Sequence, residues 1–410
     1  MSSIIIENIR LLVNTRQENK LLRGKELADL PCIENAYIII EDGIIAEYGP
    51  MASLKNKDND AIDASGQYVL PCWCDSHTHL VFAAYREEEF VDKIKGLSYA
   101  EIAAKGGGIL NSAKKLNETS EAELLRMAMT RLNEAMQLGT GAIEIKSGYG
   151  LSVEGELKML RVIKKLKELS PIPVKATFLG AHTYPLEYKE DHQGYIDLII
   201  NEMLPVIAKE ELADYIDVFC ETNFFSPEET ETICKAGIHH GLKAKIHANQ
   251  LNLSGGVETG VKLGALSVDH LETIDDRTIN LLANSDTIGT LLPTAAFFLR
   301  MPFQPARQLI DAGCAIALAS DFNPGSSPSG NMNLVVSMSC IQMKMLPEEA
   351  INAATINGAY AMEVQDECGS ITVGKKANLI FTKPISSLSY LPYAFGSNCI
   401  DKVMIGGEWL

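Results

Sequence analysis

Apolar residues follow two different patterns along this chain of 410 residues. In the first 66 positions, short β-like runs such as Ala36–Ile40 and Ile44–Tyr48 flank turn signals such as Glu41–Gly43. Apolar runs separated by an Asp-Gly turn are typical of hairpins, and no helical period interrupts them. The same pattern returns near the C-terminus. The two ends therefore predict one small discontinuous β-sandwich module, made of residues 1–66 and 366–410.

Between these ends, from residue 67 to residue 365, apolar runs of strand length alternate with amphipathic helical stretches. Clear helical stretches are Glu121–Leu138, Glu154–Leu169 and Ala306–Ala312. Buried strands that are each followed by a helix predict an α/β fold, a (β/α)₈ TIM-type barrel, with a doubly wound open sheet as the alternative. The strands are expected at Val69–Cys74, Ala142–Ile145, Val174–Leu179, Ile216–Cys220, Ala244–Ile246, Ala265–Val268, Thr287–Leu292 and Ala315–Ala319.

Charge and cysteine content restrict the partners and the compartment. The formal net charge of −17 argues against nucleic acid and against an anionic membrane surface. The N-terminus lacks the pattern of a signal peptide, and no apolar run approaches the roughly 20 residues of a membrane helix. Nine scattered cysteines predict reduced thiols and a cytoplasmic location. Two of them, Cys72 and Cys74, are interpreted as apolar fillers, because zinc thiolate pairs normally flank a turn.

The segment Asp75–Leu80, at the end of the first barrel strand, carries the first candidate chemistry. Its two histidines, His77 and His79, stand at positions i and i+2. On an extended strand such positions face the same side, so both imidazoles can reach one metal ion. The pair alone is weak evidence, because many chains contain it by chance.

Further polar residues fall where later strands end, which is where a barrel places its chemistry. Of the eight histidines in the chain, five lie at predicted strand ends. One such histidine is most simply structural, but five of them with an aspartate on one rim favour a metal site. In chain order these residues are His77, His79, His182, His247, His270 and Asp321.

This order of ligands resembles the amidohydrolase superfamily, and the likeness extends along nearly the whole chain. EIKSGYGL and TFLGAH are more discriminating than the metal ligands, which the whole superfamily shares. The segments that carry the resemblance are Asp75–Phe82, Gly106–Ile109, Glu144–Leu151, Glu156–Arg161, Thr177–His182, Asp217–Glu221, Asp269–Leu271 and Asp321–Ser326.

The resemblance implies one Zn²⁺ or Fe³⁺ per chain, held by His77, His79, His247 and Asp321. Three imidazoles and one carboxylate suit zinc and leave an exchangeable position for water. Lys146 lies near the end of the second strand, whereas two-metal relatives carry a bridging lysine on the fourth. A mononuclear site is therefore favoured.

The resemblance also implies a set of substrate-binding residues. Arg86, in the first βα loop, would bind a substrate carboxylate bidentately; the alternative is a surface ion pair with Glu87–Glu89. The turn at Asn323–Ser327 precedes a helical stretch, so its amides are expected to bind an anion. The full set is Arg86, Tyr149, His182, Gln250, Asn323, Gly325 and Ser326.

Gln250 is a departure from the pattern, because relatives often carry a glutamate three residues after the histidine of the fifth strand. Glutamine can orient a water or a ring N–H, but it cannot accept a proton. The catalytic set is therefore expected to be His270, Asp321 and Gln250, with the general-base role on Asp321 or His270.

The resemblance implies hydrolysis of 4-imidazolone-5-propanoate to N-formimidoyl-L-glutamate, a step of histidine degradation. Alternatives are another cyclic-amide hydrolase, a deaminase on the same scaffold, and a metal-binding scaffold without turnover. The expected partners are a small-molecule substrate with a carboxylate and a second copy in a homodimer. Neither nucleic acid nor a membrane is expected.

Overall fold

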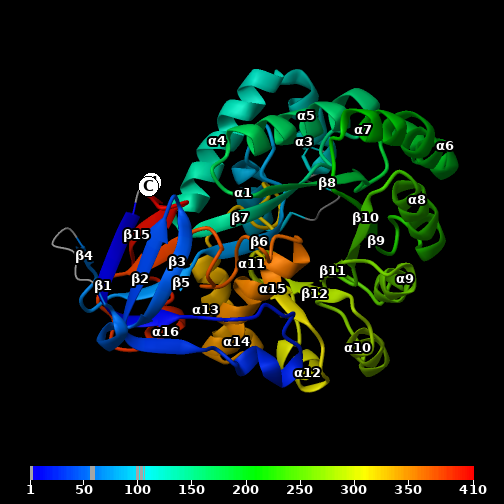
Figure 1. The fold of residues 1–410 in the computed structure, drawn as a ribbon. Coiled ribbons are helices and arrows are strands. Elements are labelled where there is room, and N and C mark those ends of the chain that lie inside the picture. The colour runs from blue at the N-terminus through cyan, green and yellow to red at the C-terminus, as the bar shows by residue number, and fades with distance from the viewer. Residues whose placement is uncertain (1–2, 56–60, 98–100, 102–104, 106) are drawn as a thin grey trace.

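The computed structural model describes residues 3–55, 61–97, 101, 105 and 107–410. Gly106, the first residue of the predicted glycine-rich segment, lies outside this range. Figure 1 shows two parts, a sheet built from the two ends of the chain and a larger part in which strands alternate with helices. Both parts agree with the two patterns seen in the sequence.

A mixed sheet joins the N-terminal and C-terminal strands. Its strand order is β16-β15-β14-β5-β1-β2-β3, with β4 paired to β1. In Figure 1 the blue strands of the N-terminus and red strand β15 lie in this one sheet. The strands are β1 (Ser3–Val13), β2 (Cys32–Glu41), β3 (Ile44–Pro50), β4 (Ile62–Asp63), β5 (Tyr68–Pro71), β14 (Leu379–Thr382), β15 (Ile400–Ile405) and β16 (Glu408–Trp409).

The second sheet contains eight strands in the sequential order β6 to β13, and all neighbouring strands are parallel. The barrel closes just beyond β13, where the amide of Asp321 donates to the carbonyl of His77 and the amide of His79 donates to Phe322. This closure confirms the predicted barrel over the open sheet. The strands are β6 (Trp73–Thr78), β7 (Thr140–Lys146), β8 (Val174–Ala181), β9 (Tyr215–Cys220), β10 (Lys243–Ala248), β11 (Ser267–His270), β12 (Ile288–Leu291) and β13 (Ile316–Leu318).

Helices surround this barrel, and three of them match the sequence prediction to within one residue, namely α4, α5 and α12. Ser120 and Ser152 cap α4 and α5, each accepting the backbone N–H of the third helical residue, so the sequence itself sets these starts. The helices are α1 (Glu87–Ile94), α3 (Ile109–Glu118), α4 (Glu121–Gln137), α5 (Val153–Leu169), α6 (His192–Leu198), α7 (Leu204–Glu210), α8 (Pro227–His239), α9 (Gly256–Leu263), α10 (Asp276–Ala283), α11 (Pro293–Leu299), α12 (Ala306–Asp311), α13 (Met332–Met343), α14 (Pro347–Ala354), α15 (Ile356–Ala361) and α16 (Tyr390–Tyr393).

The first predicted strand, Val69–Cys74, is wrong as a single element. Its first part belongs to β5 and pairs with β1 and β14 of the mixed sheet, whereas β6 begins at Trp73 and belongs to the barrel. Both strands are fully buried, so no change in the alternation of apolar and polar residues marks the point where one strand ends and the next begins. Cys72 is the residue between the two sheets. The predicted domain boundaries themselves stay a prediction.

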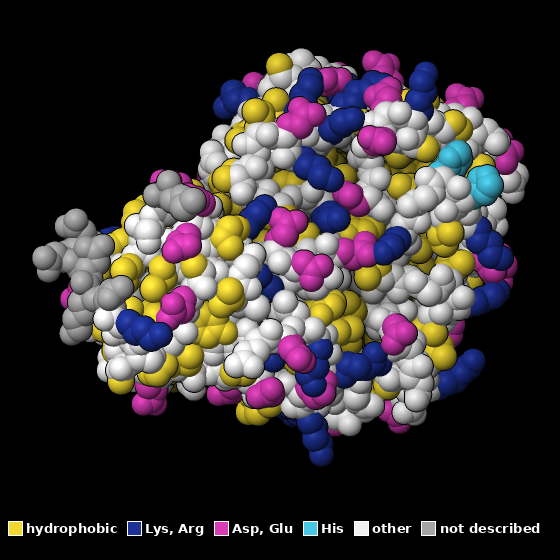
Figure 2. All heavy atoms as spheres, viewed as in Figure 1, with side chains coloured by type: hydrophobic (Ala, Val, Ile, Leu, Met, Phe, Trp, Pro, Cys, Tyr) yellow, Lys and Arg dark blue, Asp and Glu magenta, His cyan; other side chains and the backbone are white. Residues whose placement is uncertain are grey.

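The surface of the barrel mixes both signs of charge. Figure 2 shows acidic and basic side chains intermingled over the face seen there. None of the helices that the structure describes has the length and apolar character needed to cross a bilayer.

Candidate metal centre and active site

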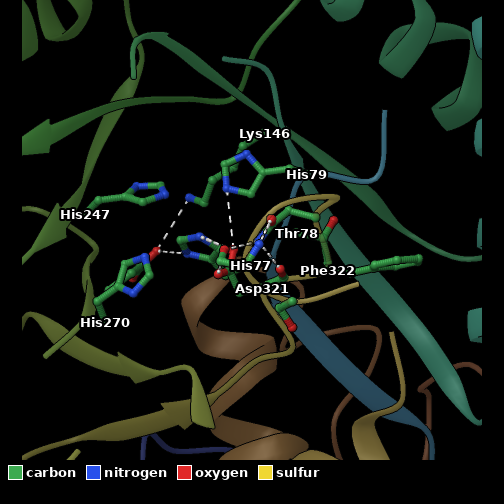
Figure 3. A network of polar contacts seen from close by, with 12 residues as sticks. His77, Thr78, His79, Lys146, His247, His270, Asp321 and Phe322 are labelled. Carbon is green, nitrogen blue, oxygen red and sulfur yellow. Dashed lines mark hydrogen bonds and ion pairs between the residues drawn. The ribbon is translucent and has the colours of Figure 1, made fainter. Parts of the chain in front are cut away.

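Three histidines from two strands meet at one end of the barrel. His77 and His79 come from the end of β6 and His247 from β10. Their potential ligand nitrogens all lie within 4.8 Å of one another, and all three side chains are buried. Figure 3 shows these rings gathered around one centre together with His270 and Asp321. The group could therefore hold a metal ion.

Carboxylates behind two of the rings decide which nitrogen faces this centre. Nδ1 of His77 lies 2.7 Å from Asp269, and Nδ1 of His247 lies 2.9 Å from Asp217. The opposite nitrogens, Nε2 of His77 and Nε2 of His247, have no hydrogen-bond partner among the described residues. Buried nitrogens without a partner are costly, and a metal ion would satisfy both. The donor set therefore fits a metal.

The protonation states agree with this interpretation. Burial lowers the pKa of His79, and the nearby His182 and His247 add to the shift. Burial likewise lowers the pKa values of His77 and His247. All three rings are thus neutral near pH 7, which is the form that binds a metal.

Asp321 faces the same centre from the segment that follows the last strand, β13. Its Oδ1 lies 3.6 Å from Nε2 of both His77 and His79. The residue adopts φ 51°, which is rare for a non-glycine residue, in the segment that closes the barrel. Burial raises the pKa of its carboxyl to about 7, although the neighbouring His270 opposes the shift. A bound cation would lower this pKa by stabilising the carboxylate.

A buried charged layer, which sequence reasoning missed, lies beneath the histidines. Nζ of Lys146 lies 2.8 Å from Asp217, 2.7 Å from Glu144 and 3.5 Å from Asp269. Lys245 pairs with the second oxygen of Glu144. Although burial acts to raise the pKa of Asp217, His247 and Lys146 hold it below its usual range. Lys146 thus anchors the two carboxylates that orient His77 and His247.

A small pocket of about 70 Å³ opens beside the histidine cluster. Most of the site residues predicted from the sequence line this pocket. Phe219 also lines it, although the sequence analysis did not select this residue. Its lining consists of His79, Tyr149, His182, Phe219, His247, Gln250, His270, Asp321, Asn323 and Ser326.

Glu156 of α5 holds the loop that carries Tyr149. Its carboxylate accepts the amides of Gly148, Gly150 and Leu151 at 3.0, 2.7 and 3.0 Å. Nδ1 of His182 donates to the carbonyl of Gly148 at 3.0 Å, and the ring stacks on His79 with ring centroids 5.3 Å apart. The loops after β7 and β8 are thereby fixed against the histidine cluster.

Arg86 lies beside this pocket. Its Nε donates to Ser112 at 2.8 Å, and its guanidinium carbon lies 5.8 Å from the centre of the Tyr149 ring. Within the described part of the chain it forms no ion pair with Glu87–Glu89 or any other acidic residue, so the surface-pair alternative finds no support there. Gly325 packs so closely that an added Cβ would lie 2.6 Å from an Arg86 nitrogen.

The structure does not support the prediction that the amides of the turn at Asn323–Ser326 bind an anion at the start of a helix. The amides of Gly325 and Ser326 both donate to Oδ1 of Asn323 at 2.8 Å. The next helix, α13, begins only at Met332. These amides are therefore already used. The side chains of Asn323 and Ser326 remain on the pocket wall.

Gln250 enters the pocket on a loop after β10, and a buried carboxylate from the end of the neighbouring strand β9 holds this loop in place. Glu221 accepts the amides of Leu251 and Asn252 at 2.8 and 3.2 Å. The preceding Asn249 adopts φ 54°. Glu272, two residues after His270, is a second buried carboxylate that sequence reasoning missed. Its place directly after the Asp-His-Leu segment is the signal that could have found it.

Comparison with known proteins agrees with the resemblance to the amidohydrolases seen in the sequence. The amidohydrolase family model matches residues 68–410. The imidazolonepropionase of Flavobacterium johnsoniae is 60% identical over 406 residues, which cover 98% of this chain and 99% of that protein. The imidazolonepropionase of Flavobacterium psychrophilum is 56% identical over 410 residues and covers 100% of both chains.

Solved structures agree in fold at much lower identity. A mutant atrazine chlorohydrolase from Arthrobacter aurescens, complexed with zinc and atraton, superposes with a TM-score of 0.71. The match covers 99% of this chain and 95% of that one at 14% sequence identity. At this identity the likeness shows the fold alone.

Proposed function

This chain belongs to the imidazolonepropionase family of amidohydrolases, and we propose that it hydrolyses the cyclic amide of 4-imidazolone-5-propanoate to give N-formimidoyl-L-glutamate. The reaction adds water across one ring C–N bond and is a step of histidine degradation. The observation that carries the proposal is a buried histidine cluster and an arginine beside one pocket, within a chain that is 60% identical to a relative of that name.

The proposed metal ligands are His77, His79, His247 and Asp321, which would hold one Zn²⁺ or Fe³⁺ per chain. When bound, such an ion supplies Lewis acidity: it polarises the ring carbonyl and lowers the pKa of water. The unpartnered Nε2 atoms of His77 and His247 support this assignment.

Asp321 and His270 are the proposed proton carriers. Asp321 accepts a proton from the attacking water while the water oxygen bonds to the ring carbonyl carbon. His270 then delivers a proton to the ring nitrogen as the C–N bond breaks. The nearby carboxylates support this role of His270: burial acts to lower its pKa, but Glu272, Asp321 and Asp269 together raise it.

Arg86 is proposed to bind the propionate group of the substrate. A guanidinium next to the pocket, without a carboxylate partner among the described residues, suits a bidentate contact with a small carboxylate. The other proposed substrate-binding residues are Tyr149, His182, Gln250, Asn323, Gly325 and Ser326.

The proposal also places the protein in the cytoplasm. All nine cysteines are free thiols, as a reducing compartment would maintain them. The expected homodimer stays a prediction, which the sedimentation coefficient of the purified protein can check.

The decisive experiment measures loss of the imidazolone ultraviolet absorbance in a sample whose metal content is determined in parallel. We expect turnover that disappears with a chelator and returns with Zn²⁺ or Fe³⁺. Ammonia release from aminopurines without imidazolone turnover would instead assign the protein to the deaminases. A metal-replete protein that hydrolyses neither substrate would contradict the proposal.

A further inference from the structure

Glu272 is a buried carboxylate that has so far entered only through its effect on the pKa of His270. It lies two residues beyond the end of β11, and its side chain is only 1% exposed. Its Oε1 lies 3.3 Å from Nδ1 of His270. Its other oxygen, Oε2, has no hydrogen-bond partner within the part of the chain that the structure describes.

The backbone between the two residues is unusual. His270 and Leu271 have φ angles of 89° and 66°, which non-glycine residues rarely adopt one after the other. The amide of Leu271 donates to Ala248 at 3.2 Å and that of Thr273 to Asn249 at 2.9 Å. These hydrogen bonds tie the turn to the end of β10. The turn thereby brings the carboxylate of Glu272 against the ring of His270.

The other carboxylates of the site are already engaged. Asp269 faces His77, Asp217 faces His247, and Asp321 belongs to the proposed ligand set. Gln250 is uncharged. Among the described residues, Glu272 is therefore the carboxylate that contacts His270 at Nδ1.

We propose that Glu272 is a positioning residue for His270, an inference that rests on the proposed function. It holds the imidazole with the Nδ1 proton toward the carboxylate and Nε2 toward the pocket. The contact at Nδ1 thereby selects the tautomer and the ring orientation that present Nε2 to the substrate. Glu272 thus acts on the reaction through His270, without touching the substrate itself.

The first test is a double-mutant cycle with Glu272→Gln and His270→Asn, in zinc-loaded samples of known metal content. Glu272→Gln keeps the side-chain shape and removes the charge. We expect kcat to fall about 10–10²-fold while KM stays within about twofold. In the His270→Asn background we expect no further loss from Glu272→Gln, because the two residues act as one unit.

Glu258→Gln is the matched control. Glu258 lies on the outer helix α9 and, like Glu272, has an oxygen without a partner among the described residues. Its replacement should leave kcat unchanged. An equal loss from Glu272→Gln in both backgrounds, or an unchanged kcat, would overturn the proposal.

A second measurement does not depend on turnover, so it separates this inference from the proposed function. In protein labelled with ¹⁵N-histidine, the His270 signal is identified by its disappearance in His270→Asn. At fixed pH, we expect Nδ1 of His270 to be protonated in the wild type, and the tautomer ratio to shift in Glu272→Gln. An unchanged His270 signal would overturn the positioning role, even if the imidazolone proves not to be the substrate.

Discussion

Oδ2 of Asp269 lies 2.7 Å from Nδ1 of His77, and both side chains are completely buried. This contact fixes the ring so that Nε2 faces the proposed metal position. Lys146 in turn lies 3.5 Å from the same carboxylate oxygen. The orientation of the first proposed ligand is thus set by residues on two other strands.

Asp269→Asn should weaken metal binding about 10–100-fold, the usual effect of losing a carboxylate behind a ligating histidine. Competition with a chelating dye measures the dissociation constant directly. Asp311→Asn, an exposed change on α12, serves as the control. Equal affinities in the two variants would show that His77 needs no support from Asp269.

Arg86→Lys should raise KM strongly and leave metal content unchanged. A lysine ammonium is a point charge and cannot make the two parallel hydrogen bonds of a guanidinium. Steady-state kinetics with the imidazolone measure the effect, and Arg126→Lys on the exposed surface is the matched control. Unchanged kinetics would remove Arg86 from substrate binding.

Gly325→Ala should raise KM about tenfold with little change in stability, because the only atoms that must move belong to the end of a flexible side chain. An added Cβ would lie 2.6 Å from an Arg86 guanidinium nitrogen and 3.1 Å from its central carbon. The contact with Arg86 would displace the group proposed to bind the carboxylate.

Gly396→Ala is the control for this change, since an added Cβ there meets nothing within 4 Å. Thermal unfolding of both variants distinguishes a local effect from general destabilisation. If Gly325→Ala and Gly396→Ala have the same KM, the close approach of Gly325 has no role in binding.

Gln250→Glu should keep substantial activity, because the proposed proton carriers are Asp321 and His270. His270→Asn should lower kcat about 10²–10⁴-fold, the usual size of a general acid–base contribution. Asp321→Asn should do at least as much harm, partly through weaker metal binding. The comparison uses kcat of all three metal-replete variants. A gain above about tenfold in Gln250→Glu would show that the natural protein lacks a base.

The barrel and its rim were predictable from sequence because strand ends in a parallel barrel share one edge. The alternation of strand and helix placed His77, His79 and His247 correctly before any contact was known. The break between β5 and β6 was not predictable. Both strands are buried on both faces, and the change of sheet depends on pairing with β14, far away in the sequence.

The charged layer under the histidines was also predictable from the sequence, although the sequence analysis did not identify it. Glu144 and Lys146 occupy alternate positions of β7, and Lys245 precedes His247 by two on β10, so all point into the barrel. Charges at alternate positions in apolar strands predict a buried polar network. Which lysine meets which carboxylate depends on strand register, which the sequence alone does not state.

The residues that close the barrel also shape the pocket, and this has a consequence for synthesis on the ribosome. Asp75, two residues before His77, binds Ser320 across a separation of 245 positions. His77 and His79 therefore emerge in a nascent chain long before Asp321 exists. The proposed ligand set is complete only once translation has passed that residue, so full metal coordination follows synthesis of the barrel and cannot guide its early folding.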